Sequence, residues 1–496
     1  MGVVVEASAA QRESAAAKKS ASVLQTAALL LRRDVGTGTP ADGASADQFA
    51  RQIWKAHATE LEAHLESSQR PLQLAALTLI GASAAASPTV AHDLVNRLVT
   101  SPVLVPLLQA CEGERPRAPH ICAALVELVV ALLEVPDRAL LVQLLGAEHK
   151  RLTTLPLRAI SALPAWLRLR VLRIVRERVL ENQSLPLRCR LILFTPPALV
   201  RVASLYGGGA IDHDDQRARA AAHLAHLLLM RLVEAHSDAV DASEARQLRH
   251  AVGTSVGGGG DGSQRGVLGA SQSALGQLLL ALTPTTDLRQ QELAIAALRA
   301  LPCLLRAGYL RARLETGSLE PRASVGWFAQ VAFVCRIVSL PPPRSRDEGG
   351  EARAERDAER DAERDAAATS AGAATSAGAN TTAELDAILP PALQRGFWSK
   401  SLLHTSALVR LGGLNVLVQV LEALLRAVKS PSVATQQLMR TRLPEVQVVL
   451  SLAMRQKSAS ADGLGALLHA RALHALRLHL HRLPLAAAEA HTPTLP

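Results

Sequence analysis

Eight arginines in the first half of the sequence are the residues best suited to binding an anionic partner. A guanidinium presents a planar fork of N–H donors that matches phosphate and carboxylate oxygens. Arg170, Arg173 and Arg176 recur at helical spacing, which predicts a cationic stripe suited to contacting phosphate groups. The alternative is that these arginines face different directions and pair with Glu177 and Glu181. The candidate phosphate contacts are Arg158, Arg168, Arg170, Arg173, Arg176, Arg178, Arg188 and Arg190.

Histidines and cysteines give no comparable support for a metal site. His223 and His226 lie three residues apart in a predicted helix over 216–236, a spacing that can place two ligands on one face. No acidic or cysteine partner accompanies them, so a plain surface position is favoured. The five cysteines show no metal-ligand spacing, and several lie in apolar runs, which indicates reduced core thiols of an intracellular protein. They are Cys111, Cys122, Cys189, Cys303 and Cys335.

The sequence lacks the motifs that would indicate an enzyme. The glycine-rich run over 257–262 has no Lys-Ser or Lys-Thr pair at the mouth of a helix, which a phosphate-binding loop requires. The acidic residues at 212, 214 and 215 follow glycines in a predicted loop, where the start of the next helix favours acids. There is no nucleophile elbow and no zinc-protease helix pair. We therefore predict no catalytic residues, no metal, no cofactor and no small-molecule substrate.

The composition favours helices over strands. Ala and Leu lead the helix propensity scale, whereas the aromatic residues that favour strands make up only 2% of the 496 residues. The net charge of +10 comes almost wholly from arginine and indicates either an anionic partner or arginines on solvated helix faces. No uncharged apolar run reaches the roughly 18 residues that a membrane-spanning helix needs, so we predict no membrane association.

Prolines separate the predicted helices. Ordered structure is expected to start near Asp47, a candidate N-cap. Helices joined by short turns predict an all-α protein, specifically an irregular HEAT- or armadillo-like α-solenoid, and a globular multi-helix bundle is the alternative. The helices that follow are predicted at 71–86, 89–99, 102–111, 118–134, 137–145, 150–161, 165–181 and 196–206.

Low-complexity segments divide the chain. The predicted disordered leader over 1–46 is rich in Ala and Ser like a transit peptide, but its acidic residues argue against that function. A low-complexity insertion with charged repeats spans residues 344–384, and the apolar helical pattern resumes after it. We therefore expect the insertion to interrupt one domain. The predicted regions after the leader are a helical part at 47–343 with a flexible glycine-rich loop at 251–271, a low-complexity insertion at 344–384, a second helical part at 385–485 and a disordered tail at 486–496.

The few aromatic residues are concentrated in two stretches. Trp327, Phe328 and Phe333 recur within an apolar helical pattern, and Phe397 and Trp398 follow a proline pair. Stacking on bases is conceivable for such residues. An aromatic face among Ala and Val at helical spacing is, however, much more often core, and we predict core positions for these residues.

Several short motifs, in order along the chain, carry a family resemblance. Each motif is weakly specific, but their common order is not expected by accident. The chain resembles the N-terminal helical domain of the nucleolar pre-ribosomal-associated protein family of the Npa/Urb type. The motifs are Val179–Asn182 with Leu205-Tyr206, Arg289–Leu293, Ser318–Arg322, Trp327–Ile337, Ser339–Pro341, Ile388–Pro391, Phe397, Lys400, Leu403–Ser406, Leu408–Arg410 and Arg442–Glu445.

The resemblance implies a function. Members are non-catalytic scaffolds of early pre-60S particles in the nucleolus. Their implied partners are pre-ribosomal RNA, small nucleolar ribonucleoproteins, a DEAD-box helicase and other early assembly factors. Members are usually much longer, so we expect this chain to represent the N-terminal domain alone. The fold by itself supports equally well a protein-binding adaptor of the transport or chaperone type that has no RNA contact.

Overall fold

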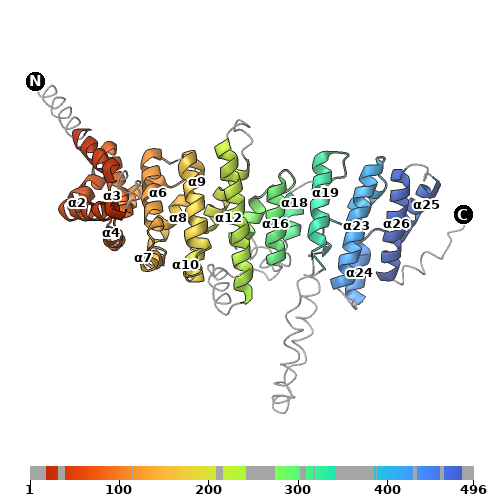
Figure 1. Cartoon of the computed structure of the whole chain (residues 1–496). Coiled ribbons are helices and arrows are strands. Elements are labelled where there is room, and N and C mark those ends of the chain that lie inside the picture. The colour runs from red at the N-terminus through yellow and green to blue at the C-terminus, as the bar shows by residue number, and fades with distance from the viewer. Residues whose placement is uncertain are drawn as a thin grey trace, which may run out of the picture. The chain divides into compact units, whose positions relative to one another are not determined.

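The computed structural model is entirely helical over the residues that it describes. These residues form helices and their connections and contain no strand, which confirms the predicted all-α class (Figure 1). They group into two compact units, unit 1 (Met1–Arg249) and unit 2 (His250–Pro496). The described residues are 18–31, 40–113, 116–207, 216–241, 274–301, 309–316, 319–340, 385–386, 388–427, 433–458 and 463–482.

The helices of unit 1 follow the predicted proline boundaries closely. Proline occupies one of the first two positions of α3, α4, α6 and α11, where the missing N–H leaves no intrahelical hydrogen bond unmade. The helices are α2 (Pro40–Glu66), α3 (Arg70–Ala86), α4 (Pro88–Thr100), α5 (Leu104–Cys111), α6 (Pro119–Glu134), α7 (Arg138–Leu144), α8 (Lys150–Arg158), α9 (Ala165–Ile174), α10 (Leu187–Leu191), α11 (Pro196–Ala203) and α12 (Gln216–Asp241).

Packing in unit 1 runs through four central helices. Helix α3 packs against α2, α4 and α6, helix α6 against α9, and α9 against α12. Helix α6 is apolar on nearly all sides, with Leu125, Val129 and Leu132 fully buried. Burial of each such side chain stabilises the fold by about 1.5–3 kcal/mol. The unit is therefore held together by Ala, Val and Leu with few aromatic residues.

The start of the ordered chain differs from the prediction. Residues 18–31 are helical, and α2 begins at Pro40 rather than near Asp47. Asp47 is not an N-cap but lies inside α2 and forms an ion pair with Arg51 one turn later. Ala21 packs with Leu72 and Ala75 of α3. The apolar spacing within this Ala-rich segment thus outweighs its low complexity, and the predicted disorder over 1–46 is wrong for residues 18–31 and 40–46.

The helices of unit 2 surround α23, which contacts α19, α22 and α26. Helices on both sides of the predicted 344–384 insertion belong to this one unit, whereas the insertion itself, the loop at 251–271 and the tail at 486–496 lie outside the described residues. The helices are α15 (Ala274–Ala281), α16 (Leu288–Ala300), α18 (Tyr309–Thr316), α19 (Val325–Val338), α22 (Arg395–Leu402), α23 (Ala407–Ala427), α24 (Val433–Arg442), α25 (Val446–Ser458) and α26 (Gly463–Arg482).

Aromatic residues form part of the core of unit 2, as predicted. Trp327, Phe333 and Phe397 are buried, and Trp398 has no exposed surface. The indole N–H of Trp398 donates to the carbonyl oxygens of Leu393 at 3.1 Å and Arg442 at 2.9 Å, which satisfies its buried polar atom. Phe328 differs from the prediction because it is only half-buried.

Two adjacent glycines allow neighbouring helices to approach α23 closely. A Cβ atom at Gly412 would lie 2.9 Å from the ring of Trp327 on α19. A Cβ atom at Gly413 would lie 2.7 Å from the hydroxyl oxygen of Ser401 on α22, a residue with no exposed surface. Larger side chains at these positions would push α19 and α22 away from α23.

Helix α23 is the one described helix that is long and apolar enough to cross a membrane. Most of it is buried inside unit 2, and it packs against α19, α22 and α26. This is the environment of a core helix. The length and apolar composition of α23 are therefore only weak evidence for a membrane span.

Candidate functional site

The arginine-rich segment of unit 1 consists of α9 and the wider helical turn that comes directly after it. The buried side chains Leu167, Val171 and Val175 hold α9 against α6 and α12. Residues Val175–Leu180 form a π-helical turn, in which the N–H of Glu181 donates to the carbonyl oxygen of Arg176 at 2.9 Å. This wider turn shifts the register, so that residues five apart face each other.

Because of this register, the side chain of Arg176 lies beside a carboxylate. Its Nε lies 3.3 Å from Oε1 of Glu181, as an ion pair without hydrogen-bond geometry, and its Nη2 lies 3.6 Å from Oε1 of Glu177. The predicted alternative, pairing with Glu177 and Glu181, is therefore what Arg176 does. Its charge is offset within the helix.

Two arginines hold the C-terminal end of α6. Arg170 forms a bidentate contact with the carboxylate of Glu134, with Nε 2.8 Å from Oε1, and this hydrogen bonding raises the pKa of the Arg170 guanidinium. Arg178 donates to the backbone carbonyl oxygen of Glu134 at 2.9 Å. Both side chains therefore connect α6 to the α9 segment and are not free for phosphate.

Two further candidates also have internal partners. Arg168 donates to the carbonyl oxygens of Ile160, Ser161 and Leu163 at 3.1, 3.2 and 2.9 Å, so it closes the turn that precedes α9. Arg158 lies 3.8 Å from the carboxylate of Glu112. These arginines stabilise helix connections.

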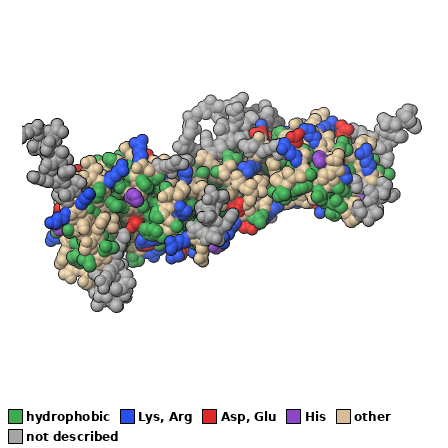
Figure 2. All heavy atoms as spheres, turned by 90° about the horizontal axis from the view of Figure 1, so that it is seen from above, with side chains coloured by type: hydrophobic (Ala, Val, Ile, Leu, Met, Phe, Trp, Pro, Cys, Tyr) green, Lys and Arg blue, Asp and Glu red, His purple; other side chains and the backbone are tan. Residues whose placement is uncertain are grey.

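The predicted stripe of Arg170, Arg173 and Arg176 does not form, because only Arg173 projects into solvent without a carboxylate partner among the described residues. Arg188 on α10 is exposed in the same way, whereas Arg190 is half-buried. In the view of Figure 2, Lys and Arg side chains are spread among apolar and other side chains rather than gathered in one patch.

Sequence reasoning missed an exposed tryptophan beside Arg173. Trp166 is 48% exposed, and it lies seven residues before Arg173 in α9, which places both on one face of the helix. The sequence feature that could have revealed it is the position of Trp166 on the helix face away from Leu167 and Val171, which are buried. An exposed indole about two turns from a guanidinium on the same helix face is suited to stacking on a base while the guanidinium binds a nearby phosphate.

The predicted histidine and cysteine positions are structural. The ring nitrogen Nδ1 of His226 is 3.1 Å from the hydroxyl of Tyr206. Cys111, Cys122 and Cys189 are buried free thiols, while Cys303 lies outside the described residues. Within the part of the chain that the structure describes, no group of three or more His, Cys, Asp or Glu side chains is placed to hold a metal ion.

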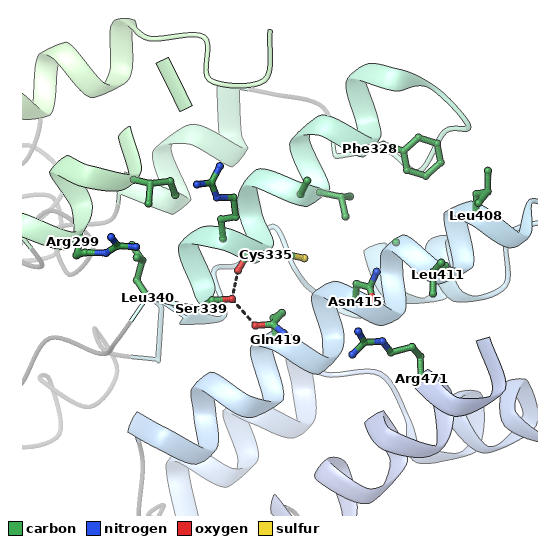
Figure 3. Close-up of a pocket in the computed structure, with 15 residues that line it drawn as sticks. Arg299, Phe328, Cys335, Ser339, Leu340, Leu408, Leu411, Asn415, Gln419 and Arg471 are labelled. Atoms are coloured by element: carbon green, nitrogen blue, oxygen red, sulfur yellow. Dashed lines mark hydrogen bonds between the residues drawn. The ribbon is translucent and has the colours of Figure 1, made fainter. Parts of the chain in front are cut away.

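Unit 2 contains a groove that the sequence did not indicate. Its volume is about 720 Å³, and its walls are one face of α19 and one face of α23 (Figure 3). Figure 3 shows Phe328 and Leu408 toward one end, and Ser339 and Gln419, which share a hydrogen bond, farther along. The wall on α19 consists of Phe328, Val331, Ala332, Cys335, Arg336 and Ser339, and that on α23 of Leu408, Leu411, Gly412, Asn415 and Gln419.

The remaining lining residues make the groove cationic. Arg299 comes from α16 and Arg471 from α26, on opposite sides of the α19–α23 pair (Figure 3). Arg336 from α19 donates to the amide oxygen of Gln291 at 2.8 Å, a neutral partner. None of the described lining residues is Asp or Glu. Burial raises the pKa of the Cys335 thiol to about 11, so it stays protonated and is no nucleophile at neutral pH.

Comparison with known families assigns the chain. Residues 7–330 match the family described as Npa1, ribosome 60S biogenesis N-terminal, over more than half of the sequence. The chain belongs to this family. A comparison with curated proteins finds no significant match. Membership in the Npa1 family implies a role in biogenesis of the 60S ribosomal subunit, within pre-60S particles and together with other assembly factors.

The Npa1 match also fixes how far the family extends over the two regions. It covers all eight candidate arginines and Trp166 in unit 1. It ends inside α19, so most of the groove in unit 2 lies beyond it. The motifs from Ile388 to Glu445 likewise lie beyond the matched residues, and their resemblance stays a prediction.

Proposed function

We propose that this chain is a non-catalytic scaffold in early assembly of the 60S subunit, acting in nucleolar pre-ribosomal particles and supporting processing and folding of pre-ribosomal RNA. The observation that carries the proposal is the Npa1 match across residues 7–330. Family resemblance extends it to partners. These are pre-ribosomal RNA, small nucleolar ribonucleoproteins, a DEAD-box helicase and other early assembly factors.

The helix packing supports an irregular α-solenoid of HEAT or armadillo type as the form of this scaffold. In unit 1 the successively packed helices α3, α6, α9 and α12 begin at residues 70, 119, 165 and 216. These intervals of about 50 residues are near the period of HEAT and armadillo repeats. In unit 2 the series α16, α19, α23 and α26 packs in the same successive way. Stacked repeats expose a long surface for RNA and proteins.

RNA contact is proposed for the exposed members of the arginine group. Arg173 and Arg188 lie in solvent without carboxylate partners among the described residues, and Trp166 shares the face of Arg173. Contacts of this kind go to phosphates and unpaired bases, so they would hold RNA with little sequence preference. Five other candidates bond within the unit and orient its helices, namely Arg158, Arg168, Arg170, Arg176 and Arg178. Half-buried Arg190 remains a proposed phosphate contact.

The decisive experiment is ultraviolet crosslinking of the tagged chain in cells, followed by sequencing of the bound RNA. We expect large-subunit precursor RNA and early assembly factors in the same purification, with the tagged chain concentrated in nucleoli. Recovery of transport or chaperone cargo without pre-ribosomal RNA would instead support the adaptor function. Substituting Arg173 and Arg188 should reduce crosslinks near α9 and leave the assembly factors bound.

A further inference from the structure

The two walls of the groove in unit 2 have the same spacing. On α19 and its C-cap, the residues Phe328, Val331, Cys335 and Ser339 follow at steps of three, four and four residues. On α23, Leu408, Leu411, Asn415 and Gln419 follow at the same steps. Phe328 pairs with the Leu408 end and Ser339 bonds Gln419, so the two helices run in the same direction. The groove therefore extends straight along both helices for about 16 Å, or three helical turns.

The end of this groove near Phe328 and Leu408 is apolar and open to solvent. Leu408 is 52% exposed, and Phe328 and Leu411 are only half-buried. Ala332 on the opposite wall is exposed as well, and its small side chain leaves room between the helices. An elongated ligand with its own apolar stripe would cover these side chains. The dimensions fit a helix of about three turns better than a compact small molecule.

The charged residues around the groove indicate which residues should flank the apolar stripe of that ligand. Arg299 and Arg471 form no ion pair with any described residue, and Arg336 bonds only a neutral amide. Three guanidinium groups from three different helices therefore line a groove in which the other described side chains are apolar or uncharged and polar, with no carboxylate. A helix carrying Glu or Asp beside its apolar stripe would supply the missing counter-charges.

We propose that the α19–α23 groove binds an acidic amphipathic helix of a partner protein. This docking surface is separate from the RNA contact in unit 1. A single-stranded RNA fits the groove less well, because Phe328 is the only aromatic residue among the described lining residues, so the groove offers no series of rings on which successive bases could stack. The inference goes beyond the scaffold function, since it assigns the chemistry of one partner and its place on the chain.

The test is selection of binders from a displayed library of helical peptides of about 12 residues. Every peptide in the library has Leu at its first, fourth, eighth and eleventh positions, which places the leucines on one face of the helix. The other positions vary among Glu, Asp, Lys, Arg, Ala and Gln. The purified full-length chain is the bait. We expect the recovered peptides to be enriched in Glu and Asp next to the leucines. Recovery of basic or neutral peptides would overturn the proposal.

Variants then locate the binding. The double charge reversal Arg299→Glu with Arg471→Glu should lower the affinity for a labelled acidic peptide by about tenfold or more. Ala332→Arg, at an exposed position, should weaken it by filling the groove, and a helical circular dichroism spectrum checks that each variant is folded. Arg188→Glu in unit 1 is the matched control and should leave the affinity unchanged.

Two results would contradict the groove assignment. The first is unchanged peptide affinity in both the charge reversal and Ala332→Arg. The second is a labelled oligouridine of about 12 nucleotides that binds more tightly than the peptide and is lost in the same variants. Because the measurement uses purified chain and peptide, its outcome is independent of whether pre-ribosomal RNA is recovered from cells.

Discussion

The two arginine-containing regions of this protein differ in what lies opposite their guanidinium groups. In unit 1, Arg170 faces Glu134 and Arg176 faces Glu181, and other arginines bond backbone carbonyls. In unit 2, Arg299 and Arg471 face a partly apolar groove without carboxylates. Density of arginine along a sequence therefore marks helix-to-helix contacts in one region. Convergence of separate arginines around a partly apolar groove marks a binding surface in the other.

The energetic reason is desolvation. An arginine that already bonds a half-buried carboxylate would have to give up that partner before it met a phosphate. An arginine in solvent without a partner loses only water. Substitution of the paired arginines of unit 1 should therefore reduce stability, whereas substitution of Arg299 and Arg471 in unit 2 should reduce binding.

Acidification should produce the largest effect, and in unit 2. Burial lowers the pKa of His479 from 6.5 to about 4, and its Nδ1 has no hydrogen-bond partner. The folded state keeps this ring neutral while the unfolded chain takes up a proton below pH 6.5. Stability is therefore full above that pH and falls by about 2 kcal/mol by pH 5. Denaturant unfolding followed by tryptophan fluorescence at pH 7 and pH 5 measures the loss.

The matched control is His479→Leu, which should remove most of this acid sensitivity. His149 in unit 1 is also buried with its pKa lowered by desolvation, so a smaller dependence of the same sign should remain. Equal acid sensitivity of the wild-type chain and His479→Leu would contradict the assignment.

Crowding at Gly413 should have an effect of similar size. In Gly413→Val the new side chain would collide with Ser401 on α22, so we expect destabilisation of unit 2 by about 2 kcal/mol. Chemical denaturation measures it. Gly326→Val is a useful control, because nothing lies within 4 Å of a Cβ atom there. Comparable losses in both variants would show that glycine flexibility rather than close packing is responsible.

The contrast within unit 1 can be tested directly with Arg170→Met and Arg173→Met. Loss of the bidentate contact with Glu134 should destabilise the chain by about 1–2 kcal/mol, since both partners are partly solvent-exposed. Arg173→Met should change stability by less than about 0.5 kcal/mol. Urea unfolding of the two variants side by side provides the comparison. Equal effects would remove the distinction between paired and free arginines.

The smallest effect on stability, and the clearest on RNA, is expected for Arg173→Glu with Arg188→Glu. The free energy of unfolding should stay within about 0.5 kcal/mol of wild type. Affinity for single-stranded RNA should fall, and the slope of its logarithm against the logarithm of salt concentration should decrease by about one to two. Filter binding over a salt series measures both. An unchanged slope would mean that RNA is bound elsewhere.

Local patterns predicted much of the fold correctly. Proline spacing located most helices of unit 1. Apolar context identified Trp327 and Trp398 as core. These features depend on residues within a few positions of one another, which is the range over which propensity and capping act.

The candidate sites depended on contacts that sequence spacing does not contain. Arg170 meets Glu134 across 36 residues, and the π-helical turn places Arg176 opposite Glu181 rather than along a stripe. The groove needs Arg299 and Arg471 to converge from helices far apart in the chain. Phe328 was expected in the core because its neighbours are, yet its position on α19 faces the groove.

The common direction of α19 and α23 gives the groove an electrical polarity. Both helices begin near Phe328 and Leu408, where the aligned peptide dipoles of each helix contribute about half a positive charge. At the other end, Arg426 donates to the carbonyl oxygen of Ser339 at 3.2 Å and offsets the negative end of α19. A bound helix should therefore lie antiparallel, with its C-terminus beside Phe328 and Leu408. The groove would then distinguish the direction of its partner as well as its charge.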